Sequence, residues 1–148
     1  MAASSKPGAR ARARARRLTL QGLYQWQLSD ALPADIIVQF YANQNTKDTD
    51  TDYFEELLRG AITGSDKLAA AFTPYLDRPP TQLDPIERAI LLLSTYELSA
   101  RPDVPYRVVL NEAVELARKF GAEDSHKYIN AVLDKTAAEL RRSERAAD

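Results

Sequence analysis

The sequence predicts an all-α fold, a compact bundle of about seven helices with a basic N-terminal arm. Apolar residues recur at helical spacing along most of the chain, no segment alternates as a strand does, and the breaks fall at Pro, Gly and short polar runs. The 148 residues are 45% hydrophobic and 28% charged, as in one soluble globular domain. We expect a disordered tail over residues 1–9, a single helical RNA-binding domain over 10–142 and a C-terminal tail over 143–148.

The first predicted helix runs to about Ser29, and a short second helix carries Ile36, Ile37, Phe40 and Tyr41. A polar loop follows over residues 43–52. The spacing of its apolar residues then predicts a third helix.

Asp52 and Glu55 form a capping pattern at the start of that third helix. Gly60 and Gly64 divide it from a fourth helical segment, and we expect this glycine pair to permit close contact between helices. The fourth segment ends before Pro74.

The clearest helix start is Asp84-Pro85-Ile86-Glu87, where Asp84 can cap the helix and Glu87 completes a capping box. This helix ends before Pro102. The next one opens at Pro105 and places Phe120 on its apolar face.

Gly121 is expected to end that helix in the left-handed conformation. Asp124 and Ser125 then cap the last helix, which carries Leu140 at the end of its apolar side. The predicted elements are therefore all helices joined by short loops.

Composition excludes several kinds of chemistry. The chain has no Cys and one His, so disulfides, cysteine nucleophiles and multi-ligand metal centres are not expected. His126 has no relay partner placed by the sequence, and Glu112 with Glu115 matches an ordinary exposed helix face. The longest aliphatic run covers residues 89–93, far short of the roughly 20 that span a bilayer. We expect a cytoplasmic protein that is not an enzyme and has no cofactor.

Charge is separated along the chain. Residues 1–29 carry a net charge of +6 and the remaining 119 residues carry −7. A basic segment of this kind is typical of a protein with a polyanionic partner, most often nucleic acid. A mitochondrial transit peptide has a similar composition, and a solvated charge run is the third alternative.

A continuous first helix would align several of its residues in one stripe. The stripe contains Arg10, Arg14, Arg17, Gln21, Tyr24 and Leu28. Leu23 and Trp26 lie beside it, toward the core. Tyr24 and Leu28 either complete the core or face a partner, and the sequence leaves both open. Arginines beside an accessible tyrosine also suit single-stranded RNA.

Three segments carry a resemblance to a known family. Residues 16–28 (RRLTLQGLYQWQL), 84–98 (DPIERAILLLSTYEL) and 103–135 (DVPYRVVLNEAVELARKFGAEDSHKYINAVLDK) closely resemble the NusB family of bacterial transcription antitermination factors. The resemblance extends from residue 10 to about residue 141. It implies an all-helical fold that binds the single-stranded boxA element of ribosomal RNA leader transcripts together with NusE, a small-subunit ribosomal protein. It further implies that the complex joins RNA polymerase and suppresses premature termination.

The resemblance also implies roles for individual residues. The RNA-binding set that it implies is Arg10, Arg12, Arg14, Arg16, Arg17, Asp124, Lys127 and Tyr128. The partner-binding set is Tyr24, Leu28 and Glu87. In the absence of a partner, the surface at Tyr24 and Leu28 could instead be buried in a homodimer.

This chain departs from the family pattern at three positions. Leu92 replaces a common Arg, Ala131 a common Gly, and Tyr128 the usual Phe. Leu92 removes any charged contact at that position, whereas Tyr128 keeps a ring that can stack. Two alternative functions remain: an RNA-binding module associated with an rRNA-modifying enzyme, against which the chain length argues, and an adaptor whose basic segment binds acidic protein surfaces.

Overall fold

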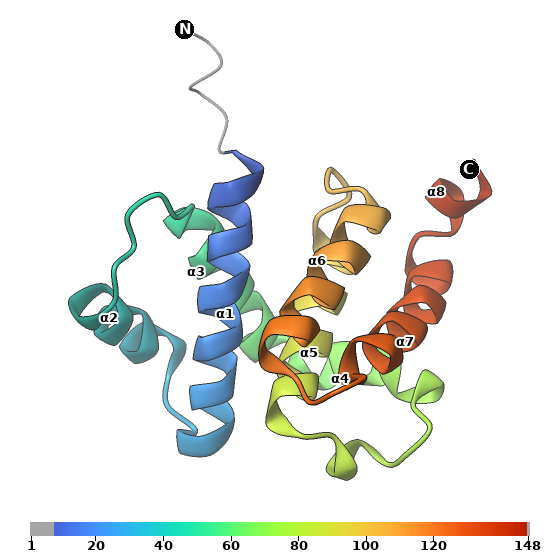
Figure 1. The fold of residues 1–148 in the computed structure, drawn as a ribbon, viewed down its shortest axis with the longest axis horizontal. Helices are drawn as coiled ribbons and strands as arrows, with labels where there is room; N and C mark the ends of the chain where they lie inside the picture. The colour runs from blue at the N-terminus through green and yellow to red at the C-terminus, as the bar shows by residue number, and fades with distance from the viewer. Residues whose placement is uncertain (1–7, 148) are drawn as a thin grey trace, which may run out of the picture.

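The computed structural model describes residues 8–147, which form eight α-helices and two short 3₁₀ helices without a strand (Figure 1). The predicted all-α fold is therefore confirmed. The α-helices are α1 (Ala9–Ser29), α2 (Pro33–Asn43), α3 (Thr51–Thr63), α4 (Ser65–Phe72), α5 (Pro85–Ala100), α6 (Tyr106–Phe120), α7 (Ser125–Leu140) and α8 (Arg142–Ala146). The 3₁₀ helices are η2 (Thr73–Tyr75) and η3 (Pro80–Gln82).

Helix α5 is the centre of the bundle and packs against α1, α3, α4, α6 and α7. Its consecutive residues Leu91, Leu92 and Leu93 are all buried, so every side of this helix is covered. Leu92 accordingly serves the core and offers no surface contact. Helices α2 and α3 lie on one side of α1, and α6 and α7 on the other (Figure 1).

Both ends of α5 have well-defined polar caps. The predicted capping box is confirmed: Asp84 Oδ1 accepts from the Glu87 backbone N–H at 2.8 Å, and Glu87 Oε1 accepts from the Asp84 N–H at 3.4 Å. At the other end, the buried guanidinium of Arg141 donates to four backbone carbonyls. These belong to Glu97, Leu98, Arg101 and Val104, at distances of 2.7 to 3.2 Å.

The two predicted roles of Gly60 and Gly64 are both supported. Gly60 lies within α3, where an added Cβ would stand 2.1 Å from the ring of Tyr96 on α5, so only glycine allows this approach. Gly64 is the residue between α3 and α4. The glycine pair therefore serves helix contact and a helix break.

Three predicted details of the helix caps are wrong. Helix α3 is capped by Asp50, whose side chain accepts from the Tyr53 N–H, and not by Asp52. Gly121 is extended at φ −88°, and it is required because a Cβ would stand 2.7 Å from the Ala117 carbonyl oxygen. The left-handed residue is Asp124, at φ 65°, and its carboxylate makes no capping hydrogen bond. The backbone therefore reverses three residues later than predicted.

The arginine-rich segment belongs to the folded domain. Helix α1 begins at Ala9, and its buried residues Ala15, Leu18 and Leu23 contribute to the core. Removing the segment, as happens to a transit peptide, would remove part of the core. Residues 1–7 of the expected N-terminal tail lie outside the described part, and α8 occupies much of the expected C-terminal tail. None of the helices described combines the length and the apolar character that a membrane crossing needs.

Candidate nucleic-acid and partner interface

The predicted stripe on α1 is a surface feature. Arg10, Gln21, Tyr24 and Leu28 are exposed, and Arg14 and Arg17 are half-buried. Tyr24 is 40% exposed and Leu28 64% exposed, so neither completes the core. Within residues 8–147, Arg10, Arg14 and Arg17 form no ion pair. Their charges are therefore free to attract an anionic ligand.

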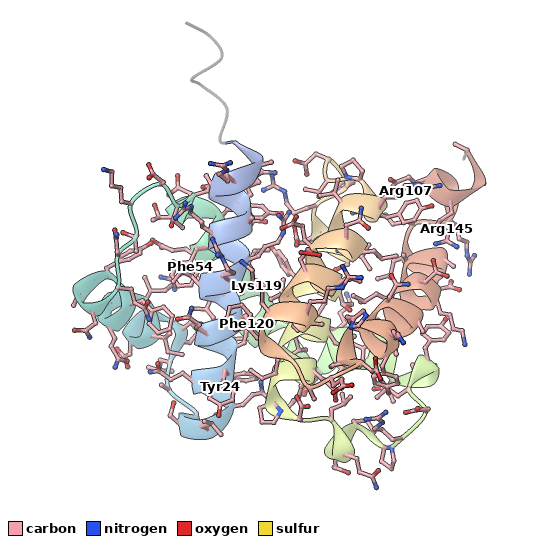
Figure 2. The ribbon with its side chains drawn as sticks, viewed as in Figure 1. Tyr24, Phe54, Arg107, Lys119, Phe120 and Arg145 are labelled. Atoms are coloured by element: carbon pink, nitrogen blue, oxygen red, sulfur yellow. The ribbon has the colours of Figure 1, made fainter. Side chains whose placement is uncertain are left out.

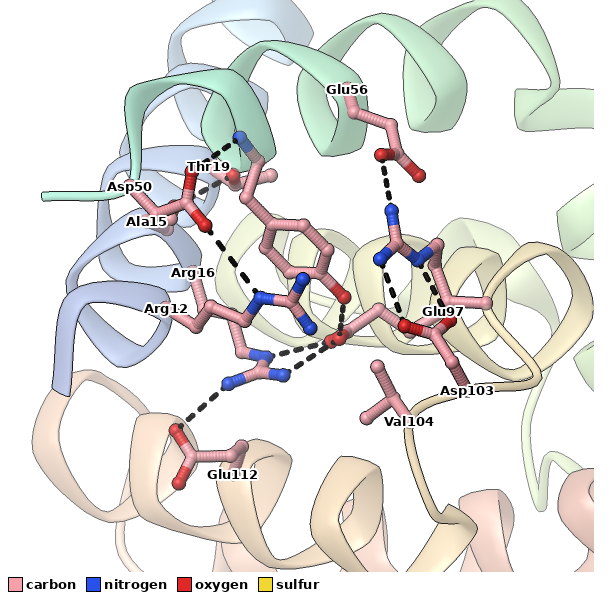
Figure 3. Close-up of polar contacts among 12 residues, drawn as sticks. Arg12, Ala15, Arg16, Thr19, Asp50, Glu56, Glu97, Asp103, Val104 and Glu112 are labelled. Atoms are coloured by element: carbon pink, nitrogen blue, oxygen red, sulfur yellow. Dashed lines mark hydrogen bonds and ion pairs between the residues drawn. The ribbon is translucent and has the colours of Figure 1, made fainter. Parts of the chain in front are cut away.

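Arg16 occupies the opposite side of α1 and is buried, so it does not offer the RNA contact that the resemblance implies. The residue is 3% exposed, and its Nε and Nη2 atoms each donate to the Glu97 carboxylate at 2.8 Å (Figure 3). The Tyr53 hydroxyl donates to the same carboxylate. Arg16 Nη1 also lies 3.5 Å from Glu112. Arg16 thus joins α1, α3, α5 and α6 in one buried network.

Arg12, one helical turn before Arg16, is directed to the same network. Its Nε lies 3.6 Å from an Asp50 carboxylate oxygen, and its guanidinium carbon lies 4.3 Å from the Tyr53 ring centroid. The i, i+4 spacing places Arg12 and Arg16 on one face of α1, whereas Arg10, Arg14 and Arg17 follow another. The arginines of the segment therefore divide into a structural pair and a surface row.

Electrostatic interactions within the buried network keep Arg16 charged and Tyr53 neutral. Burial opposes the charged form of Arg16, but the hydrogen bonds and charge of Glu97 raise its pKa above the usual value. Burial and then the negative charge of Glu97 raise the pKa of Tyr53. Tyr53 consequently remains a neutral hydroxyl that donates its proton to the carboxylate.

The end of α6 adds two side chains to the arginine row. Lys119 and Phe120 lie on the side of α6 that faces α1 (Figure 2). Arg17 and Lys119 line a hollow together with Glu112 and Glu115, and Arg14 and Arg17 line a neighbouring hollow with Phe120, in which no carboxylate takes part. Phe120 is 42% exposed, which corrects the expectation that it faces the core. In the sequence, the only sign that Phe120 belongs with the arginine row is its position as the last residue of the helix, beside Lys119.

Asp124, Lys127 and Tyr128 lie together at the start of α7. Asp124 and Lys127 are exposed and paired at 3.4 Å. Tyr128 is half-buried, its hydroxyl accepts from the Asp77 backbone N–H at 3.3 Å, and Arg78 lies over its ring. Of the three, Lys127 offers a charge to a ligand, whereas Arg78 covers one face of the Tyr128 ring.

Glu87 does not have the exposure that a partner-binding residue needs. It is 6% exposed, and besides the capping box its Oε2 accepts from the Ser125 hydroxyl at 2.9 Å. The contact joins the start of α5 to the start of α7. On the other side, the Gln27 side-chain amide of α1 donates to the Pro85 carbonyl at 2.9 Å. The end of α1 that carries Leu28 is thereby fixed beside the start of α5.

The fold and these surfaces define a small all-helical binding module. On its described surface, helix α1 exposes cations along its first half and the aromatic and aliphatic side chains of Tyr24 and Leu28 along its second half. His, Cys, Asp and Glu side chains in residues 8–147 form no group placed to hold a metal ion.

The family model described as NusB matches residues 13–138, so the chain belongs to the NusB family. This chain is 54% identical over 134 residues to the transcription antitermination protein NusB of Alcanivorax borkumensis, and the match covers 90% of this chain and 89% of the relative. The NusB protein of Escherichia coli is 52% identical over 131 residues, covering 88% and 94% respectively. NusB proteins are transcription antitermination factors and not enzymes, which confirms that expectation.

Solved structures share the fold. NusB of T. maritima superimposes with a TM-score of 0.78 at 25% identity, covering 90% of this chain and 96% of that one. NusB crystallised with NusE and double-stranded RNA gives a TM-score of 0.77 at 24% identity, covering 89% and 99%. Both comparisons support the all-helical arrangement described above.

Proposed function

We propose that this chain binds the boxA element of ribosomal RNA leader transcripts together with NusE, and thereby suppresses premature termination by RNA polymerase. The observation that carries the proposal is the row of Arg10, Arg14 and Arg17 beside Lys119 and Phe120. The cations suit phosphates, and an exposed ring suits a base. The complex would act in the cytoplasm.

The character of the surface favours unpaired RNA. A base can stack on Phe120 only where its face is open, whereas the bases of a duplex are covered by their neighbours. The related NusB structure contains double-stranded RNA, so the strandedness of the ligand needs a direct comparison.

NusE is assigned to the other half of the α1 stripe. Tyr24 and Leu28 form an exposed pair of large apolar side chains, and tyrosine is enriched at the centres of protein interfaces. The same pair would be covered in a homodimer when NusE is absent. Measuring the molar mass of the chain alone over a range of concentrations, and again after NusE is added, distinguishes a homodimer from the complex with NusE.

The test is the salt dependence of binding to a boxA oligonucleotide, measured with and without NusE. Each phosphate neutralised on a single strand contributes a slope of about −0.7, so Arg10→Gln, Arg14→Gln and Arg17→Gln combined should flatten the slope by roughly 2. Arg59→Gln, at an exposed position on α3, is the matched control. Equal slopes for the wild type and the triple variant would exclude the row as the RNA site.

The same assay compares RNA classes. We expect the single-stranded boxA oligonucleotide to bind more tightly than the duplex of the same sequence. Binding of an acidic protein surface with no binding of either RNA would support the adaptor function instead.

A further inference from the structure

Arg78 and Tyr128 form a fixed planar pair on the surface. The guanidinium carbon of Arg78 lies 4.2 Å from the Tyr128 ring centroid. Asp77 holds both partners: its carboxylate accepts from Arg78 Nε at 2.7 Å, and its backbone N–H donates to the Tyr128 hydroxyl at 3.3 Å. The pair therefore joins the segment before α5 to α7, and the arginine is held in place instead of extending freely into solvent.

The Arg78 side chain remains accessible beside the ring. Tyr128 covers one side of the planar group, while the side chain is still 34% exposed, from which we infer that the opposite face of the guanidinium is open. Arginine planes stack on unpaired bases much as aromatic rings do. Because Arg78 covers one face of Tyr128, the surface offered to a ligand there is the arginine.

The surroundings select the part of a nucleotide that can approach. Arg78 and Tyr128 line a hollow together with Gln82, Glu87 and Asp124, among others. Arg78 is the only Lys or Arg among the lining residues, and Asp84, Glu87, Glu123 and Asp124 supply carboxylates. Carboxylates repel phosphate but accept hydrogen bonds from base amino groups. The hollow thus suits an uncharged base better than a phosphate.

We propose that Arg78 is an RNA-binding residue and that an unpaired base carrying an amino group stacks on the open face of its guanidinium. The inference rests on the proposed function, since it concerns the same RNA. It adds a base site on the α5–α7 side of the molecule, separate from the phosphate row on α1.

Arg78→Lys tests the inference, because lysine keeps the charge and loses the plane. With a boxA oligonucleotide and NusE present, we expect binding to weaken about tenfold while the salt slope stays unchanged. Arg59→Lys, at a position 51% exposed on α3, should bind as the wild type does. Circular dichroism melting of Arg78→Lys should match the wild type.

A series of boxA oligonucleotides, each with one abasic position, locates the base that contacts Arg78. One abasic position should weaken binding to the wild type and have no further effect on Arg78→Lys, as expected for two changes that remove the same interaction. On the wild type, uracil at that position should also weaken binding, whereas a base with an amino group should preserve it. This last comparison needs no variant protein.

The outcomes separate this inference from the proposed function. Failure of the wild type to bind RNA overturns both. RNA binding by the wild type with Arg78→Lys unaffected overturns only the role of Arg78. A slope reduced by about 0.7 in Arg78→Gln with Arg78→Lys unaffected identifies a phosphate contact and overturns base stacking. Lowered affinity for NusE with unchanged RNA affinity identifies a protein contact and overturns it as well.

Discussion

Arg16 of α1 and Glu97 of α5 are 81 residues apart in sequence, yet they form paired hydrogen bonds of 2.8 Å in the buried centre of the molecule. Two parallel N–H···O contacts fix the orientation of both side chains. Because Tyr53 donates to the same carboxylate, the charge of Glu97 is compensated from two helices. The relative placement of α1, α3 and α5 consequently depends on one carboxylate.

Removing one member of this pair should destabilise the fold. Arg16→Ala leaves Glu97 as an uncompensated buried charge, and we expect the free energy of unfolding to fall by about 3–5 kcal/mol. Urea denaturation followed by circular dichroism measures the change. Arg10→Ala, at an exposed position of the same helix, should alter stability by less than about 0.5 kcal/mol. Equal stability of the two variants would contradict the structural role of Arg16.

Glu87→Ala should lower stability, although a surface role would predict no change. The substitution removes the acceptor of the Asp84 N–H and of the Ser125 hydroxyl, and we expect a loss of about 1–2 kcal/mol in thermal or urea unfolding. Glu115→Ala, where the side chain is 60% exposed, is the control with nearly unchanged stability. A Glu87→Ala protein of wild-type stability that has lost NusE binding would restore the partner-facing role expected from the sequence.

Asp124 separates a backbone effect from a charge effect. At φ 65° its conformation suits Asn and disfavours Ala, so Asp124→Asn should keep stability and Asp124→Ala should lose about 1 kcal/mol. Both variants remove a negative charge near the proposed RNA surface, while three other carboxylates of the Arg78 hollow can still accept from a base amino group. Both should therefore bind boxA RNA modestly more tightly at low salt, with the gain shrinking as salt rises. Unchanged RNA affinity in both would show that the charge of Asp124 has no part in binding.

Tyr24→Asp should weaken NusE binding without unfolding the chain. The residue is 40% exposed, so a charged replacement costs little stability but disrupts an apolar interface. We expect at least a tenfold loss of affinity, about 1.4 kcal/mol, in isothermal titration calorimetry. Val108→Asp, 41% exposed on α6, should bind NusE as the wild type does. Comparable losses in both variants would indicate a nonspecific effect of the added charge.

Local sequence patterns correctly predicted the structural features that depend only on residues close together in the chain. The capping box at Asp84 and Glu87, the start of α6 after Pro105 and the exposed stripe on α1 all follow from spacing within a few turns. The cap at Asp52 was wrong because Asp48, Asp50 and Asp52 all lie near the start of that helix, and Asp50 takes the capping position. At Asp124 the backbone is left-handed and the carboxylate makes no capping hydrogen bond. Both outcomes depend on the path of the preceding loop, which local patterns do not show.

The site was harder to predict because its residues come from distant parts of the chain. The spacing of the five arginines separates Arg12 and Arg16 from Arg10, Arg14 and Arg17, but it does not show which group is buried or that Arg16 meets Glu97. Likewise, the contact of Arg78 with Tyr128 exists only once the segment before α5 packs against α7. Tertiary packing decides which charged groups are structural.

The hydrogen bonds from Arg141 to the end of α5 bear on the order in which parts of the domain fold. The four carbonyls that it binds belong to residues before position 105, whereas their donor lies 37 to 44 residues later in the chain. A chain that has been synthesised only as far as α6 must leave those carbonyls to water, and that end of α5 lacks its capping bonds. The residue that follows α7 therefore completes the polar cap of α5, and we expect that end of the central helix to become rigid only after α7 has packed.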